Sequence, residues 1–515
     1  MVLRIGEARC RASASGRWMF GVAVGILAAV PGATSAQPAA TDAPAATVAG
    51  EIAHLQEMGR LFPTLGKSVQ KAPGIIPRLE LDPDPSGFVA TYQPGGLSVT
   101  MGNPFFQNLG TNGRTCFTCH QPADGWAVSA QHMKARFAAS AGQDPLFRPV
   151  DGATCPSDDV STPAARRQAY GLLLAKGLFR IGLPLPANPE FSITGVDDPH
   201  GCNTNPLTGL TGPNSGIVSV YRRPLPATNL GFLSSIMWDG RETSLASQAV
   251  DAILGHAQAA QPPTSAQQQQ IVAFERGLYT AQLFDAGAKS LSTNGATGGP
   301  VAVADALAGF YPGVNDPFDG NPRGIPFTSE IFTLYGKWGG FPGAGPTSAA
   351  RQAIIRGQDV FNQTRINITG VTGINDVLGV PVVSGSCGTC HNTPNAGNHS
   401  LAAPLNIGIA NAGASSPPGL DISGLPVFTI ACNSGPLAGQ VFQVTDLGRA
   451  TITGKCADIG KVKGPILRGL AARAPYFHNG SATTLRDVVN FYDQRFSIGL
   501  TDQQKSDLVA FLNAL

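Results

Sequence analysis

A five-residue pattern, Cys-x-x-Cys-His, occurs twice in this chain, at residues 116–120 and 387–391. Two thiols at this spacing can add across the two vinyl groups of a haem, and the histidine that follows then falls under the iron as an axial ligand. A zinc site would need a second pair of cysteines or histidines nearby, and a redox-active dithiol would not need the histidine. The pattern therefore predicts two covalently bound haem c groups. Their attachment residues are Cys116, Cys119 and His120 in the first motif and Cys387, Cys390 and His391 in the second.

The first 36 residues have the pattern of an export signal. Four arginines precede a short apolar stretch at residues 18–30, and small residues at 34–36 offer a cleavage site. The stretch is 13 residues long, whereas a helix needs roughly 20 apolar residues to cross a bilayer, so a membrane anchor is the less favoured interpretation. We predict that residues 1–36 are a cleaved signal peptide and that the mature protein is periplasmic. No later segment is apolar enough to span a membrane.

The remaining cysteines indicate disulfides. Of the nine cysteines, Cys10 lies in the predicted signal and four belong to the haem motifs, which leaves two pairs that are close in sequence. Disulfides persist in exported proteins, and an even remainder favours pairing over buried free thiols, the alternative reading. The predicted bonds are Cys155–Cys202 and Cys432–Cys456.

The helical patterns suggest two haem domains. A chain of 515 residues is long for one domain, and apolar periodicity predicts helices at residues 244–260, 267–287, 348–361 and 501–515. In the third of these, Gly357 and Phe361 share a face and predict a close crossing by another helix. An opening helix, a haem motif and a closing helix make the plan of a cytochrome c domain. We therefore expect a mainly α fold of two cytochrome c-like haem domains, at residues 37–345 and 346–515, with long Gly/Pro-rich loops. The net charge of +2 gives no argument for binding nucleic acid.

Two further segments resemble a known family. Residues 237–241 read Met-Trp-Asp-Gly-Arg and are followed by Ser244, Leu245, Gln248 and Ala249. This segment resembles a motif of the bacterial di-haem cytochrome c peroxidases. Residues 464–470 and 474–480, Gly-Pro-Ile-Leu-Arg-Gly-Leu and Ala-Pro-Tyr-Phe-His-Asn-Gly, resemble their second-domain motif. The resemblance covers roughly residues 95–515, with long insertions at 140–225 and 290–345.

The resemblance implies roles for three residues near the first haem. In the family, that haem reacts with peroxide and the second relays electrons, with a tryptophan between them; Trp238 takes that position here. The family's acid, which assists peroxide cleavage, is replaced by Gln258. His256, two residues earlier, could carry the proton instead, since an imidazole titrates near neutrality. Gln248 could orient a ligand or a water. Structural roles for His256 and Trp238 remain the alternative.

The second haem lacks the family's usual ligand. All six methionines lie at or before Met237, so none from the second domain can bind the second iron. The family's methionine position is Tyr492 here, a replacement that resembles the MauG-type branch, in which the second haem has a histidine and a tyrosine as ligands. A packed helix aromatic is the alternative reading of Tyr492. The predicted iron ligands are therefore His120, His391 and Tyr492.

These features favour a periplasmic peroxidase-type oxidoreductase. Hydrogen peroxide would react at the first haem, the second haem would relay or store oxidising equivalents, and an electron-donor protein or an organic substrate would be the partner. Two alternatives stay open: a di-haem oxygenase that uses O2, like relatives that cleave rubber, and a pure electron-transfer cytochrome. The family often holds calcium between its domains, and the carbonyls of Arg473 and Pro475 match liganding positions. The sequence leaves oligomerisation open.

Overall fold

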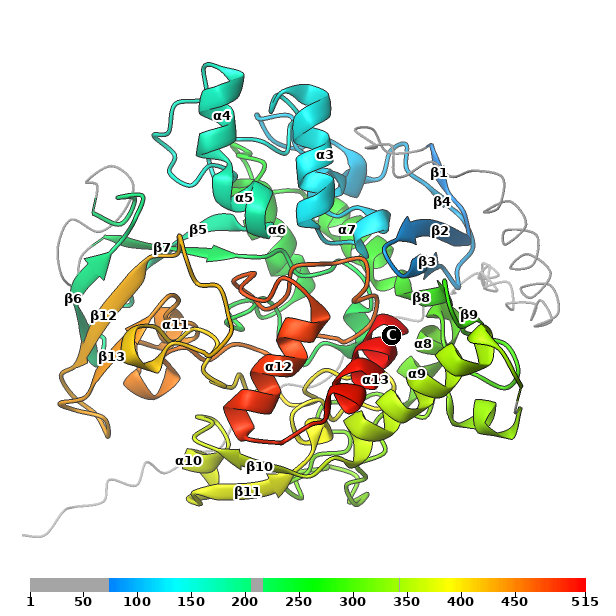
Figure 1. Cartoon of the computed structure of the whole chain (residues 1–515). Coiled ribbons are helices and arrows are strands. Elements are labelled where there is room, and N and C mark those ends of the chain that lie inside the picture. Colours follow the sequence, from blue (N-terminus) through cyan, green and yellow to red (C-terminus); the bar gives the residue numbers. More distant parts are fainter. Residues whose placement is uncertain (1–73, 205–215, 342) are drawn as a thin grey trace, which may run out of the picture. The chain divides into compact units, whose positions relative to one another are not determined.

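The computed structural model describes residues 74–204, 216–341 and 343–515 (Figure 1). All of them fall in one unit, Leu65–Leu515. The predicted signal peptide, residues 1–36, lies outside the described residues. Within the described residues, none of the helices is long and apolar enough to cross a membrane.

The predicted fold class was wrong. Helices make up 31% of the structure and strands 17%, so the chain is mixed α/β rather than mainly α; a cytochrome c-like domain is supported. Several strands lie in segments whose Gly and Pro content had predicted loops. Strands β5 (Phe179–Pro184) and β7 (Ile217–Arg222), for example, pair along their whole length. Burial on both sides of β7 explains the discrepancy, because Val218 to Arg222 are all buried and so give no alternating pattern.

The strands form small antiparallel sheets. A four-stranded sheet has the order β2-β3-β8-β9, a three-stranded sheet the order β13-β12-β6, and three pairs complete the set. In β12 the buried residues Phe428, Ile430 and Cys432 alternate with partly exposed ones, as expected for a sheet with one face on the core. The other bounds are β1 (Ile75–Ile76), β2 (Leu79–Asp84), β3 (Gly87–Tyr92), β4 (Ser98–Val99), β6 (Phe191–Asp197), β8 (Tyr279–Asp285), β9 (Lys289–Ser290), β10 (Ile366–Thr369), β11 (Val382–Gly385), β12 (Val427–Cys432) and β13 (Val441–Val444).

One sheet joins the two halves of the chain. Strand β6 pairs with β12, with Ile193 opposite Ile430, and Figure 1 shows β6, β12 and β13 side by side. Both predicted disulfides are confirmed: Cys155–Cys202, with Cα atoms 5.5 Å apart, and Cys432–Cys456, with Cα atoms 6.1 Å apart. The second bond ties the end of β12 to a turn after α11. The domain boundary near residue 345 stays a prediction.

The four predicted helices are present, but the one expected at residues 267–287 ends at Arg276, and residues 279–285 form strand β8 instead. Helix α13 begins with a capping box formed by Thr501 and Gln504. The helices are α2 (Cys116–Cys119), α3 (Ala130–Ser140), α4 (Pro163–Ala169), α5 (Gly171–Lys176), α6 (Leu245–Gly255), α7 (Ser265–Arg276), α8 (Pro300–Ala306), α9 (Pro346–Gln363), α10 (Asn375–Leu378), α11 (Ala450–Thr453), α12 (Leu485–Phe496) and α13 (Asp502–Asn513).

The close helix crossing predicted at Gly357 is confirmed between α9 and α13. A Cβ at Gly357 would lie only 2.0 Å from the backbone oxygen of Asp507, so only glycine permits this approach. Beside the crossing, the rings of Phe361 and Phe511 lie 5.9 Å apart, and the guanidinium of Arg356 pairs with Asp507 at 2.8 Å. This crossing supports the second haem motif, because Phe361 also lies 6.2 Å from the His391 ring.

Candidate functional site

The first cysteine–histidine motif is built on a single helical turn. Helix α2 begins with a capping box in which Thr115 and Thr118 satisfy each other's backbone N–H groups. His120 follows, and its Nδ1 donates to the carbonyl oxygen of Trp126 at 2.8 Å. Because a carbonyl only accepts, Nε2 keeps the lone pair that can bind a metal. Burial lowers the pKa of His120 against the raising effect of that hydrogen bond, so the ring stays in its neutral, ligating form.

The second motif repeats this arrangement. A short turn at Cys387–Thr389 is capped by Ser386 and Thr389. Nδ1 of His391 donates to the carbonyl oxygen of Gly397 at 2.7 Å, and burial lowers the pKa of His391 to about 4. The second histidine therefore also presents a neutral ring with Nε2 free.

None of the four motif cysteines forms a disulfide. Burial raises the pKa of Cys119 to about 11, and it raises the pKa values of Cys387 and Cys390 to about 12. A redox dithiol needs a cysteine with a lowered pKa, so these sites disfavour that alternative. Paired buried thiols followed by a neutral imidazole are the donor set that haem c requires.

A cavity of about 180 Å³ lies beside the first motif. It is large, because about 10–15 Å³ of such space holds one water. Cys116, Cys119 and His120 all line it. Many of the other lining side chains are apolar, among them Leu109, Phe179, Leu225, Leu233, Leu245 and Ile253. The wall and the donor set together fit a covalently bound haem.

The three residues predicted to be catalytic line this same cavity. They are Trp238, Gln248 and His256. Trp238 precedes α6, Gln248 lies one turn into that helix, and His256 caps its end, so one helix presents two of the three side chains to the cavity. Their roles stay predictions. Tyr492 does not line this cavity, as expected for a residue assigned to the other haem.

His256 is held by a buried carboxylate. Its Nδ1 lies 2.5 Å from Oδ2 of Asp151, and Oδ1 of Asp151 pairs with Arg114 at the same distance. Burial raises the pKa of Asp151, but the charge of Arg114 and the contact with His256 outweigh it, so the pKa lies below its usual value. The ionised carboxylate accepts from Nδ1–H, which leaves Nε2 of His256 as the proton acceptor. The side chain of His256 is 44% exposed.

Sequence reasoning missed two carboxyl groups of this cavity. Asp151 lies in the 140–225 insertion, and nothing local marks it as the partner of a histidine 105 residues away. Glu275, on α7, also lines the cavity. Burial raises the pKa of Glu275 to about 8, and its Oε2 has no hydrogen-bond partner among the described residues. Glu275 is therefore neutral at pH 7.

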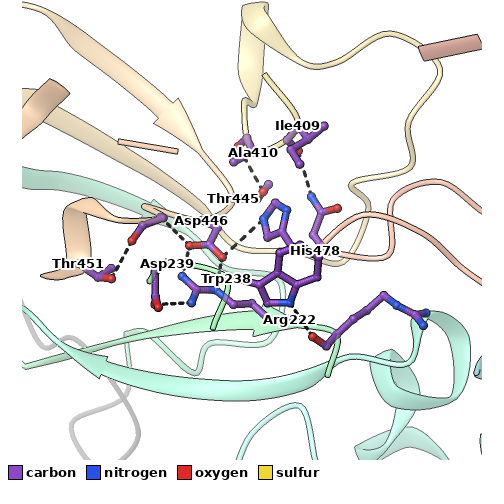
Figure 2. Close-up of polar contacts among 12 residues, drawn as sticks. Arg222, Trp238, Asp239, Ile409, Ala410, Thr445, Asp446, Thr451 and His478 are labelled. Atoms are coloured by element: carbon purple, nitrogen blue, oxygen red, sulfur yellow. Dashed lines mark hydrogen bonds and ion pairs between the residues drawn. The ribbon is translucent and has the colours of Figure 1, made fainter. Parts of the chain in front are cut away.

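Trp238 lies where the first cavity meets the surroundings of the second motif. Its Nε1 donates to the carbonyl oxygen of Arg223 at 2.7 Å, and its ring meets that of His478 edge-on, with centroids 6.0 Å apart. Figure 2 shows the two rings facing each other. Trp238 lines the first cavity and also packs in the apolar cluster that contains Phe477 and Tyr492. It thus contacts both environments.

A buried ion pair network fixes the Trp238 loop. Arg222 pairs with Asp239 at 2.5 Å and with both oxygens of Asp446, at 2.6 and 2.8 Å (Figure 2). All three side chains are at most 2% exposed. Burial raises the pKa values of both carboxyls, but the charge of Arg222 outweighs it and holds both below their usual range. Nε2 of His478 lies 3.6 Å from Asp446. The network therefore locks residues from the two halves of the chain together.

The loop that carries Trp238 is built twice in this chain. Ile236 bridges Glu242 across one turn, and Tyr476 bridges Ala482 across the other. In each turn the second residue, Met237 or Phe477, has φ of 64°. Each turn then leads into a helix, α6 or α12, that begins with a capping box.

This repeat makes Trp238 the counterpart of His478, and Ala252 the counterpart of Tyr492. Each member of the second pair is the eighth residue of its helix. Ala252 lines the first cavity. Helix α6 therefore places a methyl group where α12 places a phenol.

Tyr492 lies beside the second motif. Its ring stacks on Phe496, with centroids 6.3 Å apart and planes within 19°. Burial raises the pKa of Tyr492, and the nearby thiols of Cys390 and Cys387 raise it further. The structure thus places the phenol close to the second pair of attachment cysteines, as the ligand prediction requires. Ligation itself stays a prediction.

The calcium position does not fit a dication. The carbonyl oxygen of Arg473 accepts from Nη2 of Arg223 at 2.7 Å, and the same guanidinium donates to the carbonyl oxygens of Val128 and Lys176. A buried guanidinium thus already serves these carbonyls, and it would repel a second cation beside them.

Comparisons with known proteins agree with the motifs. The RoxA-like, cytochrome c-like family model matches residues 462–498. The cytochrome-c peroxidase IdrP2 of Denitromonas iodatirespirans is 46% identical over 78 residues, 14% of this chain and 21% of that protein. The cytochrome c peroxidase Ccp of Escherichia coli (strain K12) is 39% identical over 72 residues, 14% of this chain and 15% of that protein. The chain thus spans about a fifth or less of the length of these curated relatives.

A solved structure, a MauG-like protein associated with microbial copper homeostasis, is 17% identical, with a TM-score of 0.31 over 60% of this chain and 75% of that one. So loose a superposition supports no inference. The sequence matches confirm the predicted resemblance to the cytochrome c peroxidases and support haem c as a cofactor.

Proposed function

We propose that this protein, which resembles the cytochrome c peroxidases, is a periplasmic oxidoreductase that reduces hydrogen peroxide at the first motif. The second motif would pass on or hold oxidising equivalents. One observation carries the proposal: a single cavity contains the first cysteine–histidine motif together with Trp238, Gln248 and His256. When bound there, haem c supplies an iron that exchanges electrons with peroxide and with a donor.

His256 moves a proton in this proposal. Cleavage of the peroxide bond requires a proton to pass from one oxygen to the other, and Nε2 of His256 can accept and return it. Asp151 accepts from Nδ1–H at 2.5 Å and so holds the ring in the tautomer that this transfer needs. The same carboxylate stabilises the imidazolium that forms during the transfer.

Gln248 and Ala252 shape the space for the oxidant. Gln248 can donate from its amide to a peroxide oxygen or to a water and so orient it. Ala252 projects only a methyl group, which leaves room at the position that corresponds to Tyr492. The first site is therefore built to admit a small ligand, and the second to exclude one.

Trp238 connects the two sites. It lines the first cavity and packs in the cluster of Tyr492. Its indole N–H is held by the Arg223 carbonyl, and the Arg222 network fixes the loop beside it. An aromatic ring with so little freedom suits electron passage between the motifs. The donor would be a small redox protein or an organic substrate.

The test is to record optical and EPR spectra of the ferric, haem-loaded protein before and after one equivalent of hydrogen peroxide. We expect one high-spin and one low-spin haem, and a spectral change of both after peroxide. Two low-spin haems inert to peroxide would instead establish the electron-transfer alternative. A stable O2 complex in the protein as isolated, with no response to peroxide, would establish the oxygenase.

A further inference from the structure

The first cavity has an unusual excess of positive charge in its wall. Seven cationic side chains line it. Three of them are paired with carboxylates: Arg114 with Asp151, and both Arg222 and Arg241 with Asp239. The other four form no ion pair with any carboxylate in the described part of the chain. These four are Arg223, Lys463, Arg468 and Arg473.

Two of the four are satisfied by backbone carbonyls. Arg223 donates to the oxygens of Val128, Lys176 and Arg473. Arg473 donates in turn to the oxygens of Gly469, Ile466 and Arg468. These two guanidinium groups therefore tie loops together, and they do not need a ligand.

Arg468 and Lys463 are not satisfied in this way. Arg468 is 3% exposed and makes one long hydrogen bond, to Gly299 O at 3.3 Å. Its Nε and Nη1 have no partner among the described residues. Lys463 is 7% exposed and donates to Ser235 O at 3.1 Å. Burial lowers the pKa of Arg468 to about 10 and that of Lys463 to about 7.

Both groups are costly to bury in their charged forms unless an anion accompanies them. An unpaired buried cation loses its hydration without a compensating partner, a loss of several kcal/mol. Glu275, a carboxyl in the same wall, does not meet this need, because burial keeps it neutral at pH 7. The missing partner must therefore come from outside the described chain, and it must be anionic and able to accept hydrogen bonds.

We propose that Arg468 and Lys463 bind the propionate carboxylates of the haem attached at Cys116 and Cys119. This inference rests on the haem placement in the proposed function. A haem carries two carboxylates on the edge of the ring opposite its vinyl groups. The thiols come from α2 and the two cations from the loop at residues 463–468, so opposite edges of the group would be held by segments far apart in the sequence. Charge-assisted hydrogen bonds to Arg468 would use its free nitrogens.

The cations should also set the redox properties of this haem. Ionised propionates stabilise the ferric state, and a cation that offsets their charge raises the reduction potential. The loop at residues 463–468 would thus couple the second half of the chain to the chemistry of the first motif. A role confined to structure would not change the potential.

The experiment compares the haem-loaded variants Arg468→Met and Lys463→Met with wild type. Lys461→Met is the matched control, because Lys461 lies two residues away, is equally buried and is paired with Asp458 at 3.1 Å. The readouts are the reduction potential of the first haem at pH 7 and its resonance Raman propionate band. We expect both variants to lower the potential and shift the band, and Lys461→Met and Arg468→Lys to keep wild-type values. If Arg468→Met does not fold, Lys463→Met carries the test.

Two results would overturn this assignment. One is a wild-type potential and a wild-type propionate band in both variants. The other concerns added acetate. Acetate would change the wild-type haem spectrum in a saturable way, and Arg468→Met would abolish this change. The reduction potential of Arg468→Met without acetate would equal that of wild type. In that case the cations serve a free carboxylate ligand. Inertness to peroxide does not affect either readout, so the proposed function can fail while this inference stands.

Discussion

Nδ1 of His256 lies 2.5 Å from Oδ2 of Asp151, across 105 residues of sequence. The pair joins the end of α6 to an insertion, and Arg114 fixes the other oxygen of the carboxylate. A histidine in contact with a buried carboxylate is common in catalytic sites, because the carboxylate sets the tautomer and stabilises the protonated ring. Here the pair lies in the wall of the first cavity, which gives it a role that can be tested.

We predict that His256→Ala slows the reaction with peroxide at least about a hundredfold, the lower end of general acid–base assistance. Asp151→Asn should also slow it and change its pH profile, because the amide no longer stabilises the imidazolium, and Asp151→Glu should restore part of the rate. Stopped-flow spectra across pH 5 to 8 measure this. Asp159→Asn, in the same insertion but exposed, is the control. An unchanged rate in His256→Ala would leave proton transfer to a water that Gln248 orients.

Haem attachment gives the second prediction. The double variant Cys387→Ala/Cys390→Ala should carry one covalent haem, and Cys116→Ala/Cys119→Ala should carry the other one. Intact mass and acid–acetone extraction measure the covalent haem content. Wild type should retain both groups, and extraction of haem from wild type would contradict the central assignment.

The features that could be predicted are those encoded by residues close together in the sequence. The haem motifs and the helix cap at Thr501 are encoded within a few neighbouring residues, so the sequence reveals them directly. The disulfides followed from the export signal and a count of cysteines. The pairing of Ile193 with Ile430 could not be predicted, because it depends on a register between strands more than two hundred residues apart. The mainly α expectation failed partly for that reason and partly because strands such as β7 are buried on both sides and give no alternating pattern.

The residues of the site divide in the same way, into those that a sequence motif reveals and those whose contacts form only on folding. Trp238, Gln248 and His256 were recognisable because they lie in or near one motif before and along α6. Asp151 was not recognisable, and Arg468 lay in a recognised motif but had no role assigned to it, since the importance of both comes from what they contact, or fail to contact, after folding. A single sequence does not show that a carboxylate will lie near a distant histidine, or that a guanidinium will have no carboxylate beside it.

The Arg222 network should control the acid stability of the protein. Asp239 and Asp446 have pKa values lowered by Arg222, so their stabilising effect is present above the unfolded value of about 3.9 and lost as pH falls through the folded values. Arg222→Met leaves two buried carboxylates without this partner and should cost about 3–5 kcal/mol at pH 7.

The sign of the pH dependence should also change in Arg222→Met. Without the guanidinium, Asp239 keeps its pair with Arg241, whereas Asp446 keeps only the 3.6 Å contact with His478. Burial should then raise the folded pKa of Asp446 above its unfolded value, so its contribution to stability would be lost as pH rises through the folded pKa. Urea unfolding at pH 4 to 8 measures both effects. Arg486→Met removes an ion pair with Asp502, whose side chain is 94% exposed, and should cost less than about 1 kcal/mol. Equal losses in the two variants would contradict the prediction.

The α9–α13 crossing predicts the effect of one methyl group. Gly357→Ala places a Cβ 2.0 Å from Asp507 O, so the helices must separate, at a cost of about 1–3 kcal/mol. Gly171→Ala, at the first residue of α5, meets nothing within 4 Å and should be neutral or stabilising by up to about 1 kcal/mol. Denaturant unfolding of the loaded protein distinguishes them, and a neutral Gly357→Ala would show that the crossing can relax.

The repeated loop gives the last prediction, which concerns Tyr492 and Ala252. Both are the eighth residue of their helix, after the same turn and the same kind of cap. A phenol at that place can reach the iron of the second site, whereas a methyl group leaves the first site open. Tyr492→Phe should therefore remove a ligand and turn the low-spin haem high-spin, and Ala252→Val is the size control for the first site.

The reciprocal change tests the same geometry from the other side. Ala252→Tyr should close the first site, turn its haem low-spin and slow the reaction with peroxide by more than tenfold, while the second haem keeps its spectrum. Ala252→Val adds bulk without a ligand and should slow peroxide without changing the spin state. EPR and stopped-flow spectra measure both effects. If Tyr492→Phe leaves the spectra and potentials unchanged, the axial ligand of the second haem is another group. If Ala252→Tyr then also leaves the first haem high-spin, the two helices do not present their eighth residues to the irons, and the asymmetry between the sites must have a different origin.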